Sequence, residues 1–285
     1  MNQRSILITG CSTGIGRCCA EGLAKRGYRV FATARKDRDL AELDAIANIE
    51  ALPLDLNRPE QVEQTAETVL SRTDGHIHAL FNNGGYGQPG AVEDLKRDVL
   101  RQQFETLVFG WHDLTVRILP AMRRNGEGRI IQNSSILGLT ALPMRGAYNS
   151  AKFAIEGLTD TLRLELKGSG IHVSLIEPGP IQSRFRANAS AAFRDNITIE
   201  GSPFQTRYQD LPARLDQAGP AAPGTLPPEA VFKKLLHALE APKPKARYYV
   251  TWPTHLLGHL RRILPTSALD AVLLKIGADE SGRRR

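Results

Sequence analysis

The eight residues TGCSTGIG, from Thr9 to Gly16, constrain the fold more than any other part of this chain. They end the short apolar run SILITG, which is typical of a buried parallel strand. They also open STGIGRCCAEGLAKRG, whose apolar residues recur at helical spacing. A glycine-rich turn between such a strand and a helix presents backbone N–H groups to an anion. The sequence therefore predicts half of a βαβ unit with a phosphate site in its turn.

The alternation of strand and helix continues along the next 160 or so residues. Apolar runs that end in polar residues or glycine predict strands at YRVFATAR, IEALPLDL, HIHALFNNGG, GRIIQNSS and GIHVSLIEPG. Helical spacing is seen between them, in PEQVEQTAETVLSRT, from Val99 to Met122 and from Ala147 to Lys167. This order predicts an α/β fold, a Rossmann-type doubly wound parallel sheet whose ligands bind at the carboxyl ends of the strands.

The regular rhythm stops after Pro180. Residues 186–228 are rich in Ala, Gly and Pro, so we expect a mobile insertion there. The segment PPEAVFKKLLHALEAPKPKARYYV then predicts a helix and a last strand. With no internal repeat and no linker, we expect a single domain over residues 1–285. It consists of a core (1–185), the insertion (186–228), and C-terminal helices with the last strand (229–285).

Composition and charge exclude several other classes of protein. Hydrophobic content of 41% and a length of 285 residues are ordinary for a globular protein. The net charge is +7, but basic and acidic residues are interleaved and only Arg283–Arg285 form a basic run, so we expect no nucleic-acid partner. All three cysteines lie near the N-terminus without metal-site spacing, and no run is long enough to span a membrane. We therefore expect a cytoplasmic protein without a metal site.

The end of the second predicted strand bears on the choice of dinucleotide. A carboxylate there would accept hydrogen bonds from the ribose of NAD, whereas this chain has Arg35 and Lys36. A guanidinium can hold a 2′-phosphate through two hydrogen bonds, so the sequence favours NADP over NAD. Arg35 as an ordinary surface residue is the alternative. Ser12 and Thr13 could contact the same phosphate, and Asp55 ends the third strand near the expected adenine.

The stretch YNSAK places Tyr148 and Lys152 four residues apart, on one face of a predicted helix. Such a pair is common as a half-buried aromatic beside a solvated lysine. A phenol has an unperturbed pKa near 10, so Tyr148 could exchange a proton near neutral pH only if a positive charge favoured its phenolate. Lys152 could supply that charge.

Several motifs occur together in one order: TGCSTGIG at 9–16, NNGG at 82–85, NSSILG with Ser135, YNSAK at 148–152 and EPG at 177–179. With these motifs the chain closely resembles the classical short-chain dehydrogenase/reductase family, from about Ser5 to Ser183. The segments GPIQSRF and HLLGHLRRILPTSALD look like the subgroup of 17β-hydroxysteroid and retinol dehydrogenases.

The resemblance implies an NAD(P)-dependent alcohol dehydrogenase or ketoreductase. Ser135 would orient the substrate oxygen, Tyr148 would act as general acid and base, and Lys152 would bind the nicotinamide ribose. Residues implied to contact the cofactor, besides Tyr148 and Lys152, are Gly10, Ser12, Thr13, Gly14, Ile15, Gly16, Arg35, Lys36, Asp55, Leu56, Asn83, Gly84, Gly85, Pro178, Gly179, Ile181 and Ser183.

The chain departs from the family pattern at two positions. Gly84 stands where the family usually has alanine, which predicts a slightly looser strand end. Leu107, in TLVFG, replaces an asparagine that in the family helps hold a water linking the lysine to solvent. A leucine can neither donate nor accept a hydrogen bond, so the proton relay of this chain is expected to differ.

By the same resemblance, residues 186–228 would form a substrate loop over the site. Phe185, Ala191, Ala192, Phe193 and Phe204 predict an apolar pocket, hence a hydrophobic alcohol or carbonyl substrate. The family also implies a homodimer or homotetramer. Apolar and basic residues in THLLGHLRRILPTSALDAVLLKIG fit either a helix pair packed on the domain or peripheral contact with a membrane. A non-catalytic NADP(H)-sensing regulatory protein of the same fold is the alternative function.

Overall fold

The computed structural model describes residues 3–216, 219 and 222–280, and the basic run Arg283–Arg285 lies outside them. Its centre is a seven-stranded sheet in which every neighbouring pair is parallel, in the order β3-β2-β1-β4-β5-β6-β7. The strands are β1 (Ser5–Ile8), β2 (Arg29–Ala34), β3 (Ile49–Pro53), β4 (Ala79–Asn82), β5 (Gly128–Asn133), β6 (Ile171–Glu177) and β7 (Arg247–Tyr249).

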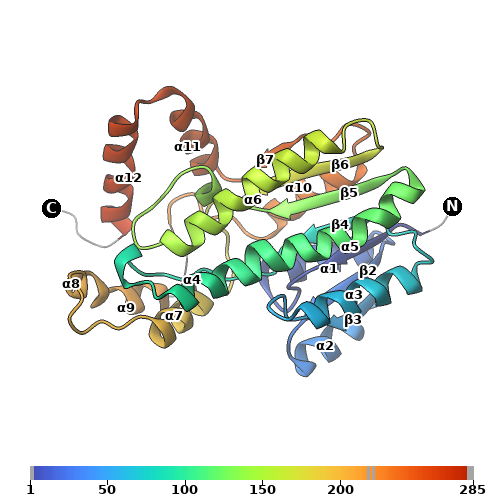
Figure 1. The fold of residues 1–285 in the computed structure, drawn as a ribbon, viewed down its shortest axis with the longest axis horizontal. Coiled ribbons are helices and arrows are strands. Elements are labelled where there is room, and N and C mark those ends of the chain that lie inside the picture. The colour runs from blue at the N-terminus through green and yellow to red at the C-terminus, as the bar shows by residue number, and fades with distance from the viewer. Residues whose placement is uncertain (1–2, 217–218, 220–221, 281–285) are drawn as a thin grey trace.

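Helices cover both faces of the sheet (Figure 1). In chain order the first ones are α1 (Gly14–Lys25), α2 (Asp37–Asp44), α3 (Pro59–Arg72), α4 (Arg97–Phe104), a π-helical turn (Glu105–Phe109), α5 (Gly110–Asn125) and α6 (Gly146–Glu165). The C-terminal part adds α7 (Phe185–Asn196), α8 (Gln205–Tyr208), α9 (Leu211–Asp216), α10 (Glu229–Glu240), α11 (Trp252–Ile263) and α12 (Thr266–Glu280). The predicted Rossmann-type doubly wound fold is confirmed.

Successive side chains along each strand point to opposite faces of the sheet, so the core is divided into two clusters, one on each face. In β1, Leu7 faces one hydrophobic cluster with α3, α5 and α6, whereas Ile6 and Ile8 face a second cluster with α1 and α10. Because both faces are buried, the strands read as continuous apolar runs in the sequence. This two-sided burial is what makes the runs at the strand positions recognisable.

In its described part, the insertion expected at residues 186–228 contains three helices, α7, α8 and α9, which the sequence did not predict. Helices α7 and α9 pack on each other, and Phe193 and Tyr208 are fully buried between them and the loop after β4. Tyr208 donates a hydrogen bond to Asp94 at 2.5 Å and accepts one from the Ala91 N–H at 2.8 Å. This small second core holds the insertion against the domain.

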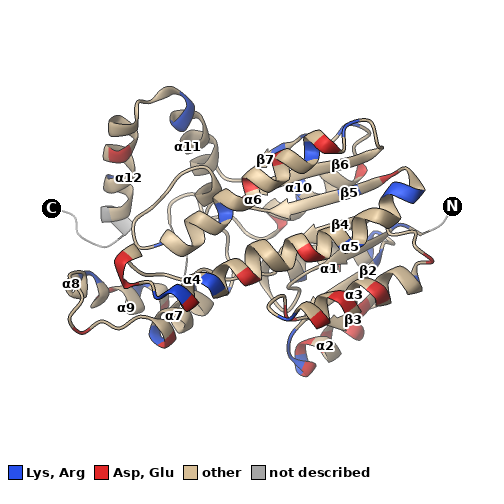
Figure 2. Cartoon of the chain, in the orientation of Figure 1, with Lys and Arg blue, Asp and Glu red and all other residues tan. Residues whose placement is uncertain are grey.

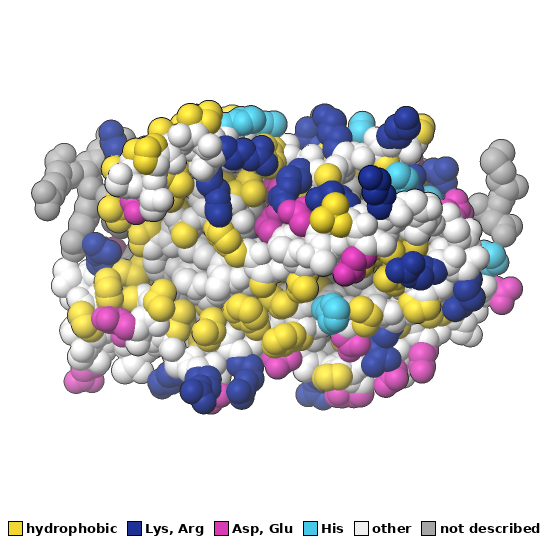
Figure 3. Space-filling view, turned by 45° about the horizontal axis from the view of Figure 1, so that its top comes forward, with side chains coloured by type: hydrophobic (Ala, Val, Ile, Leu, Met, Phe, Trp, Pro, Cys, Tyr) yellow, Lys and Arg dark blue, Asp and Glu magenta, His cyan; other side chains and the backbone are white. Residues whose placement is uncertain are grey.

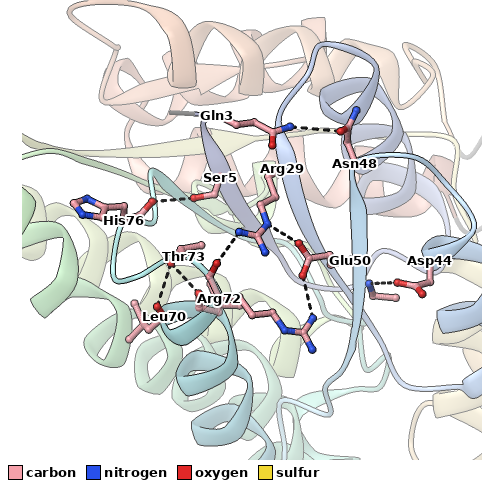
Figure 4. Close-up of polar contacts among 12 residues, drawn as sticks. Gln3, Ser5, Arg29, Asp44, Asn48, Glu50, Leu70, Arg72, Thr73 and His76 are labelled. Carbon is pink, nitrogen blue, oxygen red and sulfur yellow. Dashed lines mark hydrogen bonds and ion pairs between the residues drawn. The ribbon is translucent and has the colours of Figure 1, made fainter. Parts of the chain in front are cut away.

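The two ends of the sheet differ. At the amino ends, Arg29 donates to Glu50 at 2.5 Å and Arg72 donates to the same carboxylate at 3.0 Å, which ties β2, β3 and α3 together (Figure 4). At the carboxyl ends, the loops lead toward the two C-terminal groups of helices, α7–α9 and α11–α12 (Figure 1). Charged side chains of both signs are spread over the helices (Figure 2). Because loops leave the sheet at the carboxyl ends of its strands, a ligand site can form at that edge.

Candidate active site

The glycine turn after β1 adopts the geometry that its spacing predicts. Gly10 and Gly14 have φ angles of +72° and +58°, in the left-handed region that favours glycine. A side chain at Gly16 would overlap the backbone carbonyl of Gly10, so this glycine lets helix α1 approach the strand. No side chain caps the N-terminus of α1 at Thr13. The first-turn N–H groups of α1, beside the half-buried Ser12 and Ile15, fit an anionic pyrophosphate.

The residues predicted to select the dinucleotide lie at the ends of β2 and β3. Arg35 and Lys36 are exposed directly after β2, and within the described residues neither has an ion-pair partner. The Asp55 carboxylate accepts a hydrogen bond from the Asn57 N–H at 3.1 Å, which shapes the turn after β3. Leu56 is buried against Gly84. Two free cations at the edge of the glycine turn suit a 2′-phosphate.

Asn83 has a structural role that the sequence did not reveal. Its side-chain amide donates to the carbonyls of Thr9 and Gly10 at 2.9 and 3.2 Å, and its oxygen accepts from the Asn133 amide at 2.8 Å. The side chain thus ties the ends of β1, β4 and β5 together, so a cofactor can meet only the backbone of this residue or its remaining surface. Gly84 is equally fixed, because its N–H donates to the Thr9 hydroxyl at 2.8 Å. That Gly84 loosens this strand end relative to alanine stays a prediction.

The segment after β6 brings the last predicted cofactor residues to the same edge. Pro178 accepts a hydrogen bond from the Ile136 N–H at 2.8 Å, which places this loop beside Ser135. A side chain at Gly179 would overlap the Thr251 hydroxyl. Ile181 forms an isolated parallel bridge with Leu226. Ser183 lies next to Gly14, where an added methyl group would come within 2.9 Å of the serine Cβ.

Ser135, Tyr148 and Lys152 come together at the carboxyl ends of β5 and β6. Ser135 follows β5, and its hydroxyl accepts a hydrogen bond from the Leu137 N–H at 3.1 Å and bonds the Tyr148 side chain. Tyr148 and Lys152 belong to α6, one turn apart, with the Lys152 Nζ 5.5 Å from the Tyr148 ring centroid. Lys152 is only 3% exposed, and its Nζ donates to the Asn133 carbonyl at 2.7 Å.

Burial determines the protonation of this group more than mutual attraction does. It raises the pKa of Tyr148 to about 12, opposed by the hydrogen bond with Ser135 and by the charge of Arg145. Burial also lowers the pKa of Lys152 to about 7, opposed by the carboxylate of Glu156. Lys152 is not among the causes that act on the Tyr148 pKa, so the expected lowering of the phenol pKa by this lysine is not found. The arrangement holds a neutral phenol, which is suited to donate a proton.

A buried charge network lies one turn beyond Lys152 and was missed by the sequence reading. Glu156 accepts hydrogen bonds from Ser134 and Arg247, and Arg247 also donates to Glu177 at 2.7 Å and to Asp160 at 2.6 Å. Burial raises the pKa of Glu177 to about 8, and its second oxygen has no partner among the described residues. The three carboxylates come from α6 and β6 and the arginine from β7, so no local pattern could have indicated them.

The substrate side of the site is only partly as expected. Phe185 meets the Tyr148 ring edge-on, with 5.3 Å between ring centroids. Phe193, by contrast, is buried with Tyr208 inside the α7–α9 core, and Ala191 is exposed. Of the apolar residues expected to line the pocket, Phe185 is in ring contact with Tyr148. Leu137 and Leu142 add an apolar cluster that also contacts Tyr148.

The described residues contain no group of three or more His, Cys, Asp or Glu side chains that could hold a metal ion. Within the same residues, no helix has the length and apolar character needed to cross a membrane.

Comparisons with known proteins agree with the fold and motifs. Residues 4–193 match the family model of the short chain dehydrogenases. The chain is 43% identical over 271 residues to the uncharacterized oxidoreductase YbbO of Escherichia coli, covering 95% of this chain and 94% of the relative. It is 32% identical over 282 residues to the NADPH-dependent 3-dehydrocapnine reductase of Ornithobacterium rhinotracheale, covering 96% and 97%.

Human 17-beta-hydroxysteroid dehydrogenase type 1 is 33% identical over 263 residues, covering 88% of this chain and 78% of the relative. Among solved structures, a short-chain dehydrogenase from Streptomyces avermitilis superposes with a TM-score of 0.77 at 27% identity, covering 100% of both chains. The motifs, the parallel sheet and these matches lead to one conclusion: the chain belongs to the short-chain dehydrogenase family and is an oxidoreductase.

Proposed function

We propose that the protein is an NADP(H)-dependent oxidoreductase that transfers a hydride between nicotinamide and a hydrophobic alcohol or ketone. Tyr148 acts as the general acid and base, and Ser135 orients the substrate oxygen. Lys152 binds the nicotinamide ribose and stabilises the tyrosinate. The observation that carries this proposal is the contact of the Tyr148 side chain with the Ser135 hydroxyl, one helical turn from the buried Lys152. Ser135 comes from the loop after β5, whereas Tyr148 and Lys152 come from α6.

In the direction of carbonyl reduction, the neutral phenol is the form of Tyr148 that can donate a proton. A reduced nicotinamide, when bound, would supply the hydride for the carbonyl carbon. Tyr148, held as a neutral phenol by burial, donates its proton to the oxygen, which becomes the alcohol. Ser135 keeps that oxygen within reach of the phenol. The Lys152 charge stabilises the tyrosinate left behind.

Three features support NADP(H) as the cofactor. The glycine turn and the open N-terminus of α1 suit the pyrophosphate. Arg35 and Lys36 are exposed and unpaired within the described chain, at the place where a 2′-phosphate would lie. A relative that covers nearly all of this chain carries NADPH in its name.

Apolar surface at the site supports a hydrophobic substrate. Phe185 contacts the Tyr148 ring edge-on, and Tyr148 also packs against the Leu137 and Leu142 cluster, to which α11 and α12 contribute. An elongated or ring-shaped apolar alcohol or ketone would bury surface against these side chains. A human relative is named for a hydroxysteroid, which is consistent with this class.

The experiment that tests this function starts with binding of NADPH and NADH to the purified protein. Oxidation of each cofactor is then followed with a panel of apolar aldehydes and ketones, using Tyr148→Phe as the control. The proposal expects NADPH to bind more tightly and turnover to fall about 10²- to 10⁴-fold in the variant. Binding without turnover on any carbonyl would instead favour a non-catalytic NADP(H)-sensing protein.

We also propose a homodimer or homotetramer formed through the α4, α5 and α6 helices. Large apolar side chains are exposed along these helices and the π-helical turn, namely Leu100, Phe109, Val116, Leu158 and Leu164. On the visible face of the molecule, apolar side chains lie between charged ones along the middle (Figure 3). A second copy of the same surface would cover them by two-fold symmetry.

Helix α11 supports the proposal of peripheral membrane contact by a cytoplasmic protein. Trp252, Leu256 and Ile263 are exposed on one side of it, and His255 and Arg262 beside them border a basic hollow of about 270 Å³ that Lys234 and Lys245 also line. Such a face suits the surface of an anionic membrane. Co-sedimentation with phosphatidylglycerol vesicles, compared with phosphatidylcholine vesicles, should be lost in Ile263→Asp. Equal sedimentation of both proteins would rule out this surface.

A further inference from the structure

The surroundings of the Lys152 ammonium group differ from what the family resemblance implies. Its Nζ lies 4.4 Å from the centroid of the Trp111 ring and donates to the Asn133 carbonyl. Lys152 is 3% exposed and Trp111 is 1% exposed, so this contact is shielded from water. A cation above an indole face is attracted by the ring quadrupole, and removal of water strengthens this attraction.

The Trp111 ring is held in place independently of Lys152. Its Nε1 donates a hydrogen bond to the Gly84 carbonyl at 2.8 Å, at the end of β4. The Trp111 carbonyl in turn accepts hydrogen bonds from the Asn82 side chain at 3.4 Å and from the Thr115 hydroxyl at 2.6 Å. The indole therefore has one orientation, with a face presented to α6. Because its Nε1 is held by the Gly84 carbonyl, the indole ring can position the flexible lysine side chain.

The same helix carries the substitution noted in the sequence. Leu107 lies in the π-helical turn Glu105–Phe109, four residues before Trp111, and is 1% exposed. It packs so tightly on Gly85 that a Cβ at that glycine would overlap the leucine side chain. The position at which the family places a polar side chain is thus filled by hydrocarbon, and the indole one turn further contacts the lysine instead.

We propose that Trp111 is a positioning residue that holds the charged form of Lys152 through its indole face, replacing the polar support that Leu107 cannot give. This role rests on the proposed function insofar as Lys152 serves the reaction. The contact itself does not depend on turnover. The ordinary alternative is that Trp111 only fills the core between α5 and α6.

Few charged groups of the described residues lie near the contact between the Lys152 ammonium group and the Trp111 ring. On α6, Tyr148 and Glu156 flank Lys152 one turn to either side, and Arg145 precedes Tyr148. From β5 the lysine meets a backbone carbonyl, and from α5 it meets the indole, neither of which titrates. Arg247 and Glu177 reach Lys152 through Glu156. A titration seen from the indole can therefore be assigned with Lys152 and Glu156 variants.

The first test uses fluorescence of Trp111 in the folded, unmodified site. The chain has two tryptophans, and Trp252 is exposed on α11, so Trp252→Phe leaves Trp111 as the only reporter. We expect the emission of this variant to change with pH in one step near neutrality, as Lys152 gains or loses its charge. The step should vanish in Trp252→Phe/Lys152→Met, and should move to lower pH in Trp252→Phe/Glu156→Gln. A step that persists unchanged without Lys152 would overturn the proposal.

The second test compares Trp111→Phe with Trp111→Leu at equal folded fraction, checked by circular dichroism. Both keep an apolar core residue, but only phenylalanine keeps an aromatic face. If Trp111 holds the ammonium, the falling limb of the kcat/KM profile for carbonyl reduction moves down by about one pH unit in Trp111→Leu and less in Trp111→Phe.

The two tests separate the failure of this inference from failure of the proposed function. A protein that turns over no carbonyl can still show the Lys152-dependent fluorescence step, which would leave the contact supported and the reductase activity refuted. An active enzyme in which Trp111→Leu lowers kcat without moving the pH profile would show that the indole has a packing role only.

Discussion

The ring of Phe185 meets the ring of Tyr148 edge-on, with centroids 5.3 Å apart and planes inclined by 64°. Phe185 is the first residue of α7, so the helical insertion contacts Tyr148 through this side chain. Its ring also rests on Gly87, where a Cβ would come within 2.7 Å of it. Phe185 is therefore placed between the loop after β4 and the tyrosine, at the point where an apolar substrate would enter.

Replacing Phe185 with alanine should weaken the binding of apolar substrates. The loss of one aromatic contact in an apolar pocket raises KM by roughly 10- to 200-fold for a large carbonyl, while kcat changes little because Ser135 and Tyr148 remain. Steady-state kinetics with a large and a small ketone measure this split. Phe185→Leu should retain most of the affinity. A fall in kcat with unchanged KM would place Phe185 in the chemistry instead.

The pH dependence of carbonyl reduction should be governed by Lys152. Its pKa is lowered to about 7 by burial, whereas the pKa of Tyr148 is raised to about 12 by burial. As pH rises through 7, Lys152 loses its charge while the phenol keeps its proton. We therefore expect kcat/KM to fall with an apparent pKa near 7. Glu156→Gln, which removes the carboxylate that favours the ammonium, should shift this limb to lower pH.

The same shift predicts an effect on stability that needs no substrate. An unfolded lysine keeps its proton up to about pH 10.5, the ordinary value for this side chain. Between pH 7 and 10.5 Lys152 thus binds a proton in the unfolded chain but not in the folded one, so its own contribution to the free energy of unfolding rises with pH in this window. Urea denaturation should therefore show the free energy of unfolding of the wild type rising with pH relative to that of Lys152→Met. Parallel pH curves would mean that Lys152 is not desolvated.

Arg35 should select the cofactor. Arg35→Asp removes a charge-assisted pair with the 2′-phosphate and adds repulsion, so NADPH affinity should fall by about 10- to 100-fold or more. NADH affinity should hold or improve, because a carboxylate accepts hydrogen bonds from the ribose hydroxyls. Arg38→Asp on the next helix, where the side chain is paired with Glu42, is the matched control. Equal loss of both dinucleotides, or no loss of either, would contradict this assignment.

The assembly should depend on the α5 and α6 surface. Phe109 is 51% exposed and Leu164 is 65% exposed, so an aspartate at either position changes little within one chain but opposes the covering of this face by a second copy. Sedimentation velocity should show dissociation of Phe109→Asp toward monomer. Leu274→Asp on α12, equally exposed but on a different surface, should keep the assembly. Dissociation by Leu274→Asp, with Phe109→Asp remaining assembled, would show that the interface is formed by α12 and not by the α5 and α6 surface.

The sequence predicted those parts of the protein in which local pattern and structure coincide. Strands buried on both faces read as apolar runs, and Gly10 and Gly14 are needed for φ angles that other residues rarely adopt. The helices of the insertion were missed because Ala, Gly and Pro dominate its composition, while its stability comes from distant partners such as Tyr208 and Asp94. A local reading contains no signal of such a contact.

In the candidate site, too, local pattern predicts some features, whereas others depend on distant contacts. Spacing alone could put Tyr148 and Lys152 on one helix face, and family motifs could add Ser135. The sequence could not show that burial, and not the neighbouring lysine, dominates the pKa of Tyr148. It also gave no sign that Lys152 lies against Trp111, 41 positions earlier in the chain. Desolvation and long-range packing depend on the whole fold.

The most direct test of the central claim is to follow deuterium from NADPH labelled at the transferred position of the nicotinamide into an apolar ketone, by mass spectrometry of the product. If Tyr148 is the proton donor for hydride transfer, the wild type yields an alcohol with one deuterium on the carbinol carbon, and Tyr148→Phe yields it at least about a hundredfold more slowly. Product formed equally fast by Tyr148→Phe, or labelled cofactor that binds and transfers no deuterium to any carbonyl, would contradict the account.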